Sequence, residues 1–203
     1  MIKKIILFCS IIILGGCMHI PNNVKPVKNF DANKYLGTWY EIARTDNSYE
    51  RGLEYVQANY SLNSDGSIKV INSGFNTNSQ KIESAQGVAK FIDNPNTGLL
   101  KVSFFRPFYG SYVVFKISDD YQQAYVAGDD NSLWFLSKTR TVSKKQKQNF
   151  IEEAKKVGIN TDKLIWVEHS KCINGKAITE CNNTQILPPK YLSIEGFKKC
   201  LST

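Results

Sequence analysis

The chain has 203 residues and is basic, with 26 lysines and arginines against 18 aspartates and glutamates and a formal net charge of +8. No cluster of arginines alternates with aromatic residues as in a nucleic-acid groove, so no nucleic-acid partner is expected. The charge excess is typical of a solvated basic surface.

Residues 1–16 have the pattern of a signal peptide. Two lysines precede an apolar run over residues 5–14, which is too short to span a bilayer, since a spanning helix needs roughly 20 residues. The motif LGGC at residues 14–17 resembles a bacterial lipobox, which implies cleavage before Cys17 and acylation of its thiol. An ordinary secretory signal with an incidental cysteine is the alternative.

A lipobox implies attachment by two or three acyl chains, which hold stably because each buried methylene contributes about 0.8 kcal/mol. Met18 stands where an aspartate would be the usual inner-membrane retention signal, so the resemblance implies the outer membrane, facing the periplasm. Residues 17–29 contain Pro21 and Pro26 and predict an extended tether.

Residues 37–44 (GTWYEIAR) predict the first strand, in which Gly37 lets Trp39 turn inward to plug one end of a barrel. From residue 55 to residue 138 the dominant period is two, which indicates strands with one apolar face. For the strand over residues 112–118 both faces are apolar, and the tyrosine face is taken as inner. The predicted inner wall comprises Val56, Ala58, Tyr60, Ile68, Val70, Asn72, Leu100, Val102, Phe104, Tyr112, Val114, Trp134 and Leu136.

Eight such strands, joined mostly by hairpin turns, predict an all-β fold, an eight-stranded antiparallel up-and-down β-barrel. A helix follows, because Ser143 and Gln146 form a capping box before an apolar stripe and Gly158 occupies a C-cap position. This helix is expected to pack on the outside of the barrel. Residues 164–167 predict a short closing strand.

With these elements in order, residues 30–168 resemble the lipocalin family, in particular its bacterial outer-membrane lipoproteins and apolipoprotein D-like members. The resemblance is carried by residues 30–31 (FD), 35–44 (YLGTWYEIAR), 57–62 (QANYSL), 106–110 (RPFYG) and 133–139 (LWFLSKT). Residues 30–170 are therefore assigned to one lipocalin barrel with its helix.

One position departs from the family pattern. Lipocalins usually have an arginine that packs on the first-strand tryptophan, and here Lys138 takes that place, with Arg140 as a possible substitute two residues on. Gly37, Trp39, Lys138 and Arg140 are thus the expected barrel-closing set. If Glu41 faces inward it needs a partner, for which Lys138 and Arg140 are the candidates.

The resemblance implies a fatty acid, lysophospholipid or similar amphiphile in the barrel, for envelope lipid transport or storage. The mostly apolar inner wall agrees, although the same side chains could fill a solid core; Ala58, Gly87, Ala89 and Ala124 are small and favour a cavity. No nucleophile set or cofactor motif is found, so neither an enzyme nor a cofactor is expected.

Residues 171–203 extend beyond the usual lipocalin length. Their Cys172, Cys181 and Cys200 allow one disulfide in an oxidising periplasm, with the first two as the preferred pair. A zinc site using His169 is disfavoured because no C-x-x-C motif occurs, so no metal is expected. This extension could instead dock another envelope protein, and a homodimer is also possible.

Overall fold

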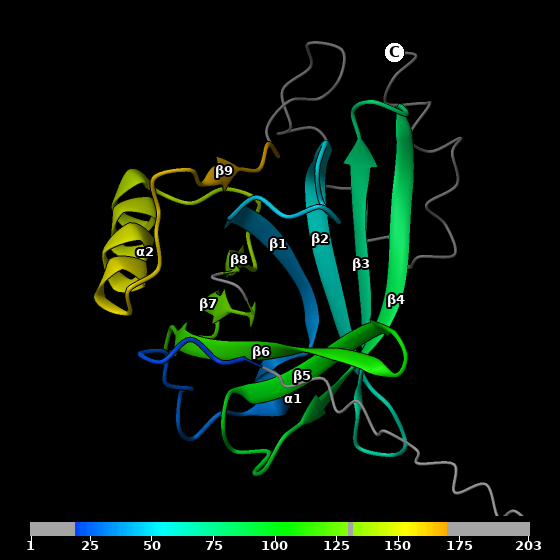
Figure 1. Ribbon diagram of the computed structural model, residues 1–203, viewed down its shortest axis with the longest axis vertical. Helices are drawn as coiled ribbons and strands as arrows, with labels where there is room; N and C mark the ends of the chain where they lie inside the picture. Colours follow the sequence, from blue (N-terminus) through cyan, green and yellow to red (C-terminus); the bar gives the residue numbers. More distant parts are fainter. Residues whose placement is uncertain (1–18, 130–131, 170–203) are drawn as a thin grey trace, which may run out of the picture.

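The computed structural model describes residues 19–129 and 132–169, whose strands form one closed antiparallel barrel (Figure 1). Eight strands follow one another up and down, and β1 pairs with both β2 and β8, which closes the sheet and confirms the predicted fold class. The strands are β1 (Gly37–Arg44), β2 (Leu53–Leu62), β3 (Ile68–Asn76), β4 (Lys81–Phe91), β5 (Leu99–Phe105), β6 (Phe108–Ile117), β7 (Gln123–Ala127) and β8 (Leu133–Ser137).

The two ends of the barrel differ. A short helix, α1 (Ala32–Tyr35), lies at the end formed by the β2–β3, β4–β5 and β6–β7 connections, which we call the closed end. The backbone N–H of Asp31 donates to the Tyr121 hydroxyl (2.8 Å), and that of Phe30 donates to the Asn96 carbonyl (2.8 Å), so this segment is fixed across two of those connections. The β1–β2, β3–β4, β5–β6 and β7–β8 connections form the opposite, open end.

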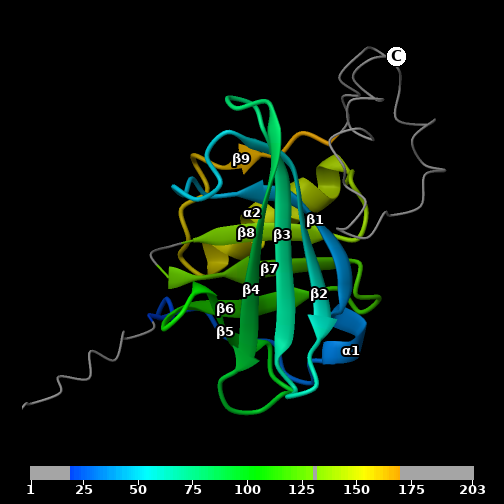
Figure 2. The ribbon, with the colours of Figure 1, turned by 90° about the vertical axis from the view of Figure 1, so that its right-hand side faces the viewer.

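Figure 2 shows β2, β3 and β4 crossing in front of β5–β8. The strands of the second group present alternate side chains to two apolar clusters. One cluster lies inside the barrel and includes Val114, Val126 and Leu136, and the other lies outside and includes Val113, Tyr125 and Phe135. Both faces of these strands are therefore apolar, which explains the ambiguous pattern of β6.

In β6, Tyr112 and Val114 face the inside while Val113 and Phe115 belong to the outer cluster, as predicted. The alternation does not continue to the end of the strand. A register shift between Val114 and Lys116 inserts one extra residue, so that Ile117 also packs against the inner cluster. A bulge of this kind changes which face the following side chains take.

The helix α2 (Lys144–Lys156) lies outside the barrel, beside β7 and β8, as predicted (Figure 1). Its N-terminus is a capping box in which Ser143 and Gln146 each accept the other's backbone N–H. Phe150 is fully buried, with its ring 5.0 Å from that of Tyr125 and 4.9 Å from that of Phe135. The predicted closing strand is β9 (Ile165–Trp166), which pairs with β1.

Within the described ranges, no helix has the length and apolar character needed to cross a membrane.

We predict that Phe150→Ala lowers the free energy of unfolding by about 3–5 kcal/mol, because it removes a fully buried ring and leaves a cavity. Urea denaturation of the purified protein measures this. The exposed helix residue Lys155 provides the control, since Lys155→Ala should change stability by no more than about 0.5 kcal/mol. A loss for Phe150→Ala as small as that of the control would contradict the packing of α2.

Candidate functional site

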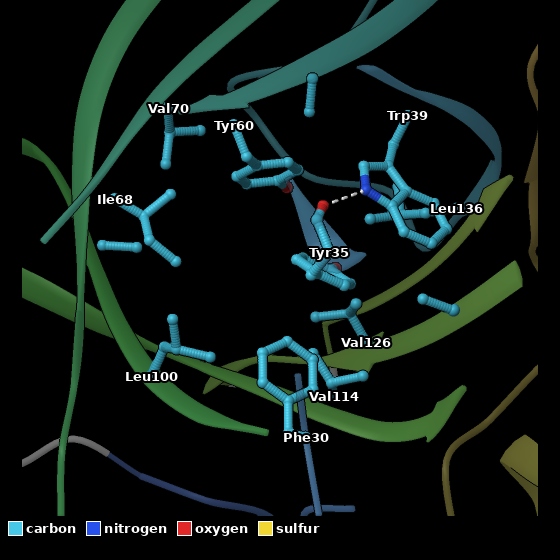
Figure 3. Close-up of a cluster of buried hydrophobic side chains, with 13 residues drawn as sticks. Phe30, Tyr35, Trp39, Tyr60, Ile68, Val70, Leu100, Val114, Val126 and Leu136 are labelled. Atoms are coloured by element: carbon cyan, nitrogen blue, oxygen red, sulfur yellow. Dashed lines mark hydrogen bonds between the residues drawn. The ribbon is translucent and has the colours of Figure 1, made fainter. Parts of the chain in front are cut away.

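The interior of the barrel brings most of the predicted inner-wall residues together (Figure 3). In Figure 3 the side chains of Ile68 and Leu100 lie across a central space from those of Tyr35 and Trp39, while Val70 lies beside Tyr60, its partner in the sheet. Of the predicted set, ten residues belong to this inner cluster or pack against it: Ala58, Tyr60, Ile68, Val70, Leu100, Val102, Tyr112, Val114, Trp134 and Leu136.

The other three predicted residues lie differently. Val56 is buried on the same face of β2 as Ala58, and Asn72 is half-buried opposite Ala58 in the sheet. Phe104 is 44% exposed and lies against Gly87, where an added Cβ would come within 2.8 Å of the ring. Gly87 is therefore small because Phe104 occupies its space, and it does not leave the void that its size predicts.

The interior is closed at one end and reached by solvent above it. Val102, Tyr112 and Trp134 point inward from central strands yet remain only partly buried. Val114 and Val126 also face inward and are fully buried. A barrel packed solid would bury all of these side chains alike. The inner side chains are therefore not all buried alike, and we call the space that they line the cup.

A cluster of aromatic rings forms the floor of this cup. Trp39 is fully buried and its indole N–H donates to the Tyr35 carbonyl (2.7 Å). The Tyr35 ring lies 4.9 Å from that of Trp39, 5.1 Å from that of Phe30 and 5.4 Å from that of Tyr60. The sequence predicts Trp39 alone as the plug. The contributions of Phe30 and Tyr35 depend on α1 folding back under the sheet.

Lys138 lies on the outside of this floor. Its ammonium sits 4.2 Å from the centre of the Trp39 ring and donates to the Leu36 carbonyl (2.7 Å). Gly37, with φ of 91°, passes beside it, and an added Cβ would lie 3.6 Å from the Lys138 nitrogen. Arg140 instead lies over the Tyr40 ring at 5.1 Å, so it does not take the place on Trp39.

Three tyrosine hydroxyls meet inside the cup. The Tyr112 hydroxyl is 2.6 Å from that of Tyr35 and 2.9 Å from that of Tyr60. Burial raises the pKa of all three well above the ordinary tyrosine value, so they are neutral hydrogen-bonding groups at physiological pH. Two hydrogen bonds among three hydroxyls use two O–H donors, which leaves the third free to donate to a bound molecule.

A charged cluster lies inside the barrel on β1, beside β8. Glu41 pairs with Leu136 in the sheet and Arg44 pairs with Trp134, so both point inward, and Arg44 donates to Glu41 Oε1 at 2.7 Å. Glu41 and Arg44 are 3% and 2% exposed. The expectation of Lys138 or Arg140 as the partner of Glu41 was wrong. A bulge between Glu41 and Ala43 makes this i,i+3 contact possible within a strand.

Arg44 also fixes the β1–β2 loop over the cup. Its second terminal nitrogen donates to the backbone carbonyls of Glu50 (2.7 Å) and Leu53 (3.2 Å). The Glu50 carboxylate in turn accepts from the Trp134 indole N–H (3.1 Å). Burial and the neighbouring Glu50 raise the pKa of Glu41, against the effect of Arg44. These polar groups hold each other and position the loop.

Two polar atoms near the cup lack a partner among the residues the structure describes. Arg44 Nε is a buried N–H donor, and Asn72 Oδ1 is a buried acceptor. A buried polar atom without a hydrogen bond is costly, so each is suited to a polar group of a ligand. The interior thus combines aliphatic side chains on β3–β5 with polar groups. These are the Asn72 amide on β3, the tyrosine hydroxyls from α1, β2 and β6, and the Glu41–Arg44 pair on β1.

The structure offers no metal centre within residues 19–129 and 132–169, where no group of three or more histidine, cysteine, aspartate or glutamate side chains is suitably placed. His169 is buried and its Nε2 lies 2.7 Å from the Glu41 carbonyl. Burial lowers the pKa of His169. The predicted acylation site Cys17 and the predicted disulfide candidates Cys172, Cys181 and Cys200 lie outside the described residues.

Comparisons with known proteins agree with this arrangement. The family model described as a lipocalin-like domain matches residues 30–169. An outer membrane lipoprotein Blc from Vibrio cholerae is 46% identical over 165 residues, covering 80% of this chain and 96% of the relative. Another from Escherichia coli K12 is 48% identical over 149 residues, covering 73% and 84%. Insecticyanin from the tobacco hornworm Manduca sexta shares the fold, with a TM-score of 0.59 and 21% identity over 76% of this chain and 88% of its own.

We predict that Arg44→Met lowers the free energy of unfolding by about 3–5 kcal/mol, because it leaves the Glu41 carboxyl buried without its partner. Urea unfolding of the variant measures the loss. The matched test is Glu41→Gln combined with Arg44→Met, which removes both charges and should recover a large part of it. If the double variant is as unstable as the single one, the pair is not the source of the stability.

A second prediction concerns pH. Burial lowers the pKa of Lys138 to about 8, from 10.5, so between these values the unfolded chain binds more protons than the folded one. The Lys138 contribution to stability therefore rises with pH across this interval. Lys138→Arg keeps its charge in both states and should abolish that rise. Unfolding free energies measured from neutral to alkaline pH test this, and identical pH profiles of the two proteins would refute it.

Proposed function

This chain belongs to the lipocalin family, and on that basis we propose that it is a lipid-anchored outer-membrane protein that holds one amphiphilic lipid in its barrel. The ligand is a fatty acid, a lysophospholipid or a similar single-chain amphiphile, carried for envelope lipid transport or storage. Binding removes the acyl chain from water without chemical change to it.

The observation that carries this proposal is the two-sided interior of the cup. Aliphatic side chains of Ile68, Val70, Leu100 and Val102 offer a wall for an acyl chain, and each methylene buried there contributes about 0.8 kcal/mol. In the same interior, the tyrosine hydroxyls can orient a polar group. An apolar cavity with a few placed polar groups is the usual make-up of a small-molecule site.

The anchor is supported by the sequence and by the relatives. The V. cholerae and E. coli proteins are named outer membrane lipoproteins, and this chain carries the LGGC motif that ends at Cys17. We place this protein in the outer membrane, attached through acyl chains on Cys17 and facing the periplasm. Cys17 precedes the start of the described domain by only two residues.

We predict that Val102→Glu abolishes uptake of a fluorescent fatty acid, because it puts a charge on the aliphatic wall where the acyl chain would lie. A fluorescence titration of the purified protein measures uptake, and circular dichroism checks that the fold survives. Lys101→Glu is the matched control, since this neighbour faces outward and its variant should bind as the unsubstituted protein does. If Val102→Glu retains uptake, the acyl chain does not bind against this wall.

A further inference from the structure

The start of the described chain is fixed at the open end of the barrel. The backbone N–H of His19 donates to Asp129 Oδ1 (2.9 Å), and the Ser111 hydroxyl lies 2.9 Å from the His19 carbonyl and 2.8 Å from Asp129 Oδ1. Ser111 is near the start of β6, and Asp129 follows β7. Both therefore lie close to the open end, and Figure 2 shows the blue start of the chain on the side opposite α1.

From His19 the chain runs along β6 toward the closed end. The Val27 N–H donates to the Val114 carbonyl and the Val27 carbonyl accepts from the Gly98 N–H, both at 2.9 Å, before Phe30 reaches the floor. The direction of this segment is thus set by hydrogen bonds along its length. Because two residues span at most about 7 Å, acyl chains on Cys17 would enter a bilayer within that distance of His19.

Exposed aromatic side chains gather at the same end. Tyr49 in the β1–β2 loop is 93% exposed, and Phe105 and Phe108 at the tip of the β5–β6 hairpin are 76% and 69% exposed. The last two rings are stacked, with centroids 6.3 Å apart and planes within 4°. We call Tyr49, Phe105 and Phe108 the rim aromatics. Of the described large hydrophobic residues that are exposed, Leu62 is the one at the closed end.

The hairpin tip has the chemistry of a membrane-contacting segment. Arg106 is exposed between the two phenylalanines, so its apolar stem can lie beside the rings while its charge meets lipid phosphates. Exposed apolar surface of this kind is unfavourable in water and favourable at a lipid interface. An acyl anchor holds the rim near the bilayer, so even a weak contact becomes populated.

We propose that the open end faces the membrane and that the rim aromatics insert into the lipid interface of the bilayer that holds the anchor. This inference rests on the proposed acylation of Cys17. It goes beyond lipid binding, because it gives the barrel an orientation. A lipid then passes between the bilayer and the cup at the rim, without crossing bulk water.

The orientation can be measured with the acylated full-length protein in unilamellar phosphatidylcholine–phosphatidylglycerol vesicles whose acyl chains are brominated. Phe105→Trp places an added indole at the rim, and Ser64→Trp places one in the exposed β2–β3 turn at the closed end. The emission of the native tryptophans is subtracted using the unsubstituted protein. We expect the indole at position 105 to shift to the blue and lose most of its emission, while that at position 64 is unaffected.

Three outcomes would overturn the proposal. Equal quenching at both positions would mean that no end faces the bilayer. An indole at position 105 that is shielded from aqueous iodide but not quenched by brominated lipid would mean that a protein, such as a second copy, covers the rim. If the protein does not float with vesicles, it is not anchored to the membrane and the proposed orientation fails. Fatty-acid uptake, measured separately, would still support lipid binding in the cup.

A functional test uses lipid transfer. Phe105→Ser with Phe108→Ser removes two exposed rings. Neither ring belongs to the inner cluster, so the fold is expected to survive. This variant should take up a fluorescent lysophospholipid from vesicles more slowly than the unsubstituted protein, with unchanged uptake of the same lipid added in solution. Leu62→Ser, a change of an exposed apolar residue at the closed end, should leave both rates unchanged. Unchanged transfer by the double variant would contradict the role of the rim.

Discussion

Closure of the sheet through the pairing of β1 with both β2 and β8 is the constraint on which the rest of the structure depends. It creates an inside, so that one face of each of the eight strands lines a common space. It also brings Trp39, on β1, over the floor formed by α1, and it places Glu41 and Arg44 beside β8. The plug, the aliphatic wall and the charged cluster all follow from this one closure.

The interior that results is amphipathic, although most of the side chains that line it are apolar. The hydroxyls of Tyr35, Tyr60 and Tyr112 are held by one another, and the carboxyl of Glu41 is held by Arg44. Since buried polar groups are tolerated only when hydrogen-bonded, these groups form networks that leave few atoms free. The polar atoms that remain without a partner then determine which polar groups of a ligand can be hydrogen-bonded.

The two ends of the barrel have different structures. Aromatic rings, α1 and Lys138 seal the closed end, whereas the open end carries the partly exposed inner wall, the rim aromatics and the start of the described chain. A binding site, an entrance and an attachment point would thus lie on one side of the molecule. In such an arrangement the anchor does more than retain the protein, because it also sets which part of it meets the membrane.

The sequence by itself determined the barrel, the outer helix and most of the inner wall, because period-two alternation and a capping box are local patterns that do not depend on contacts between distant residues. Only the tertiary structure decided three further points. Glu41 pairs with Arg44 because a bulge puts both on one face, Gly87 is small because Phe104 packs on it, and three tyrosines from α1, β2 and β6 share their hydroxyls. Each depends on a register shift or on contact between residues far apart in the chain, and neither leaves a periodic signal in the sequence.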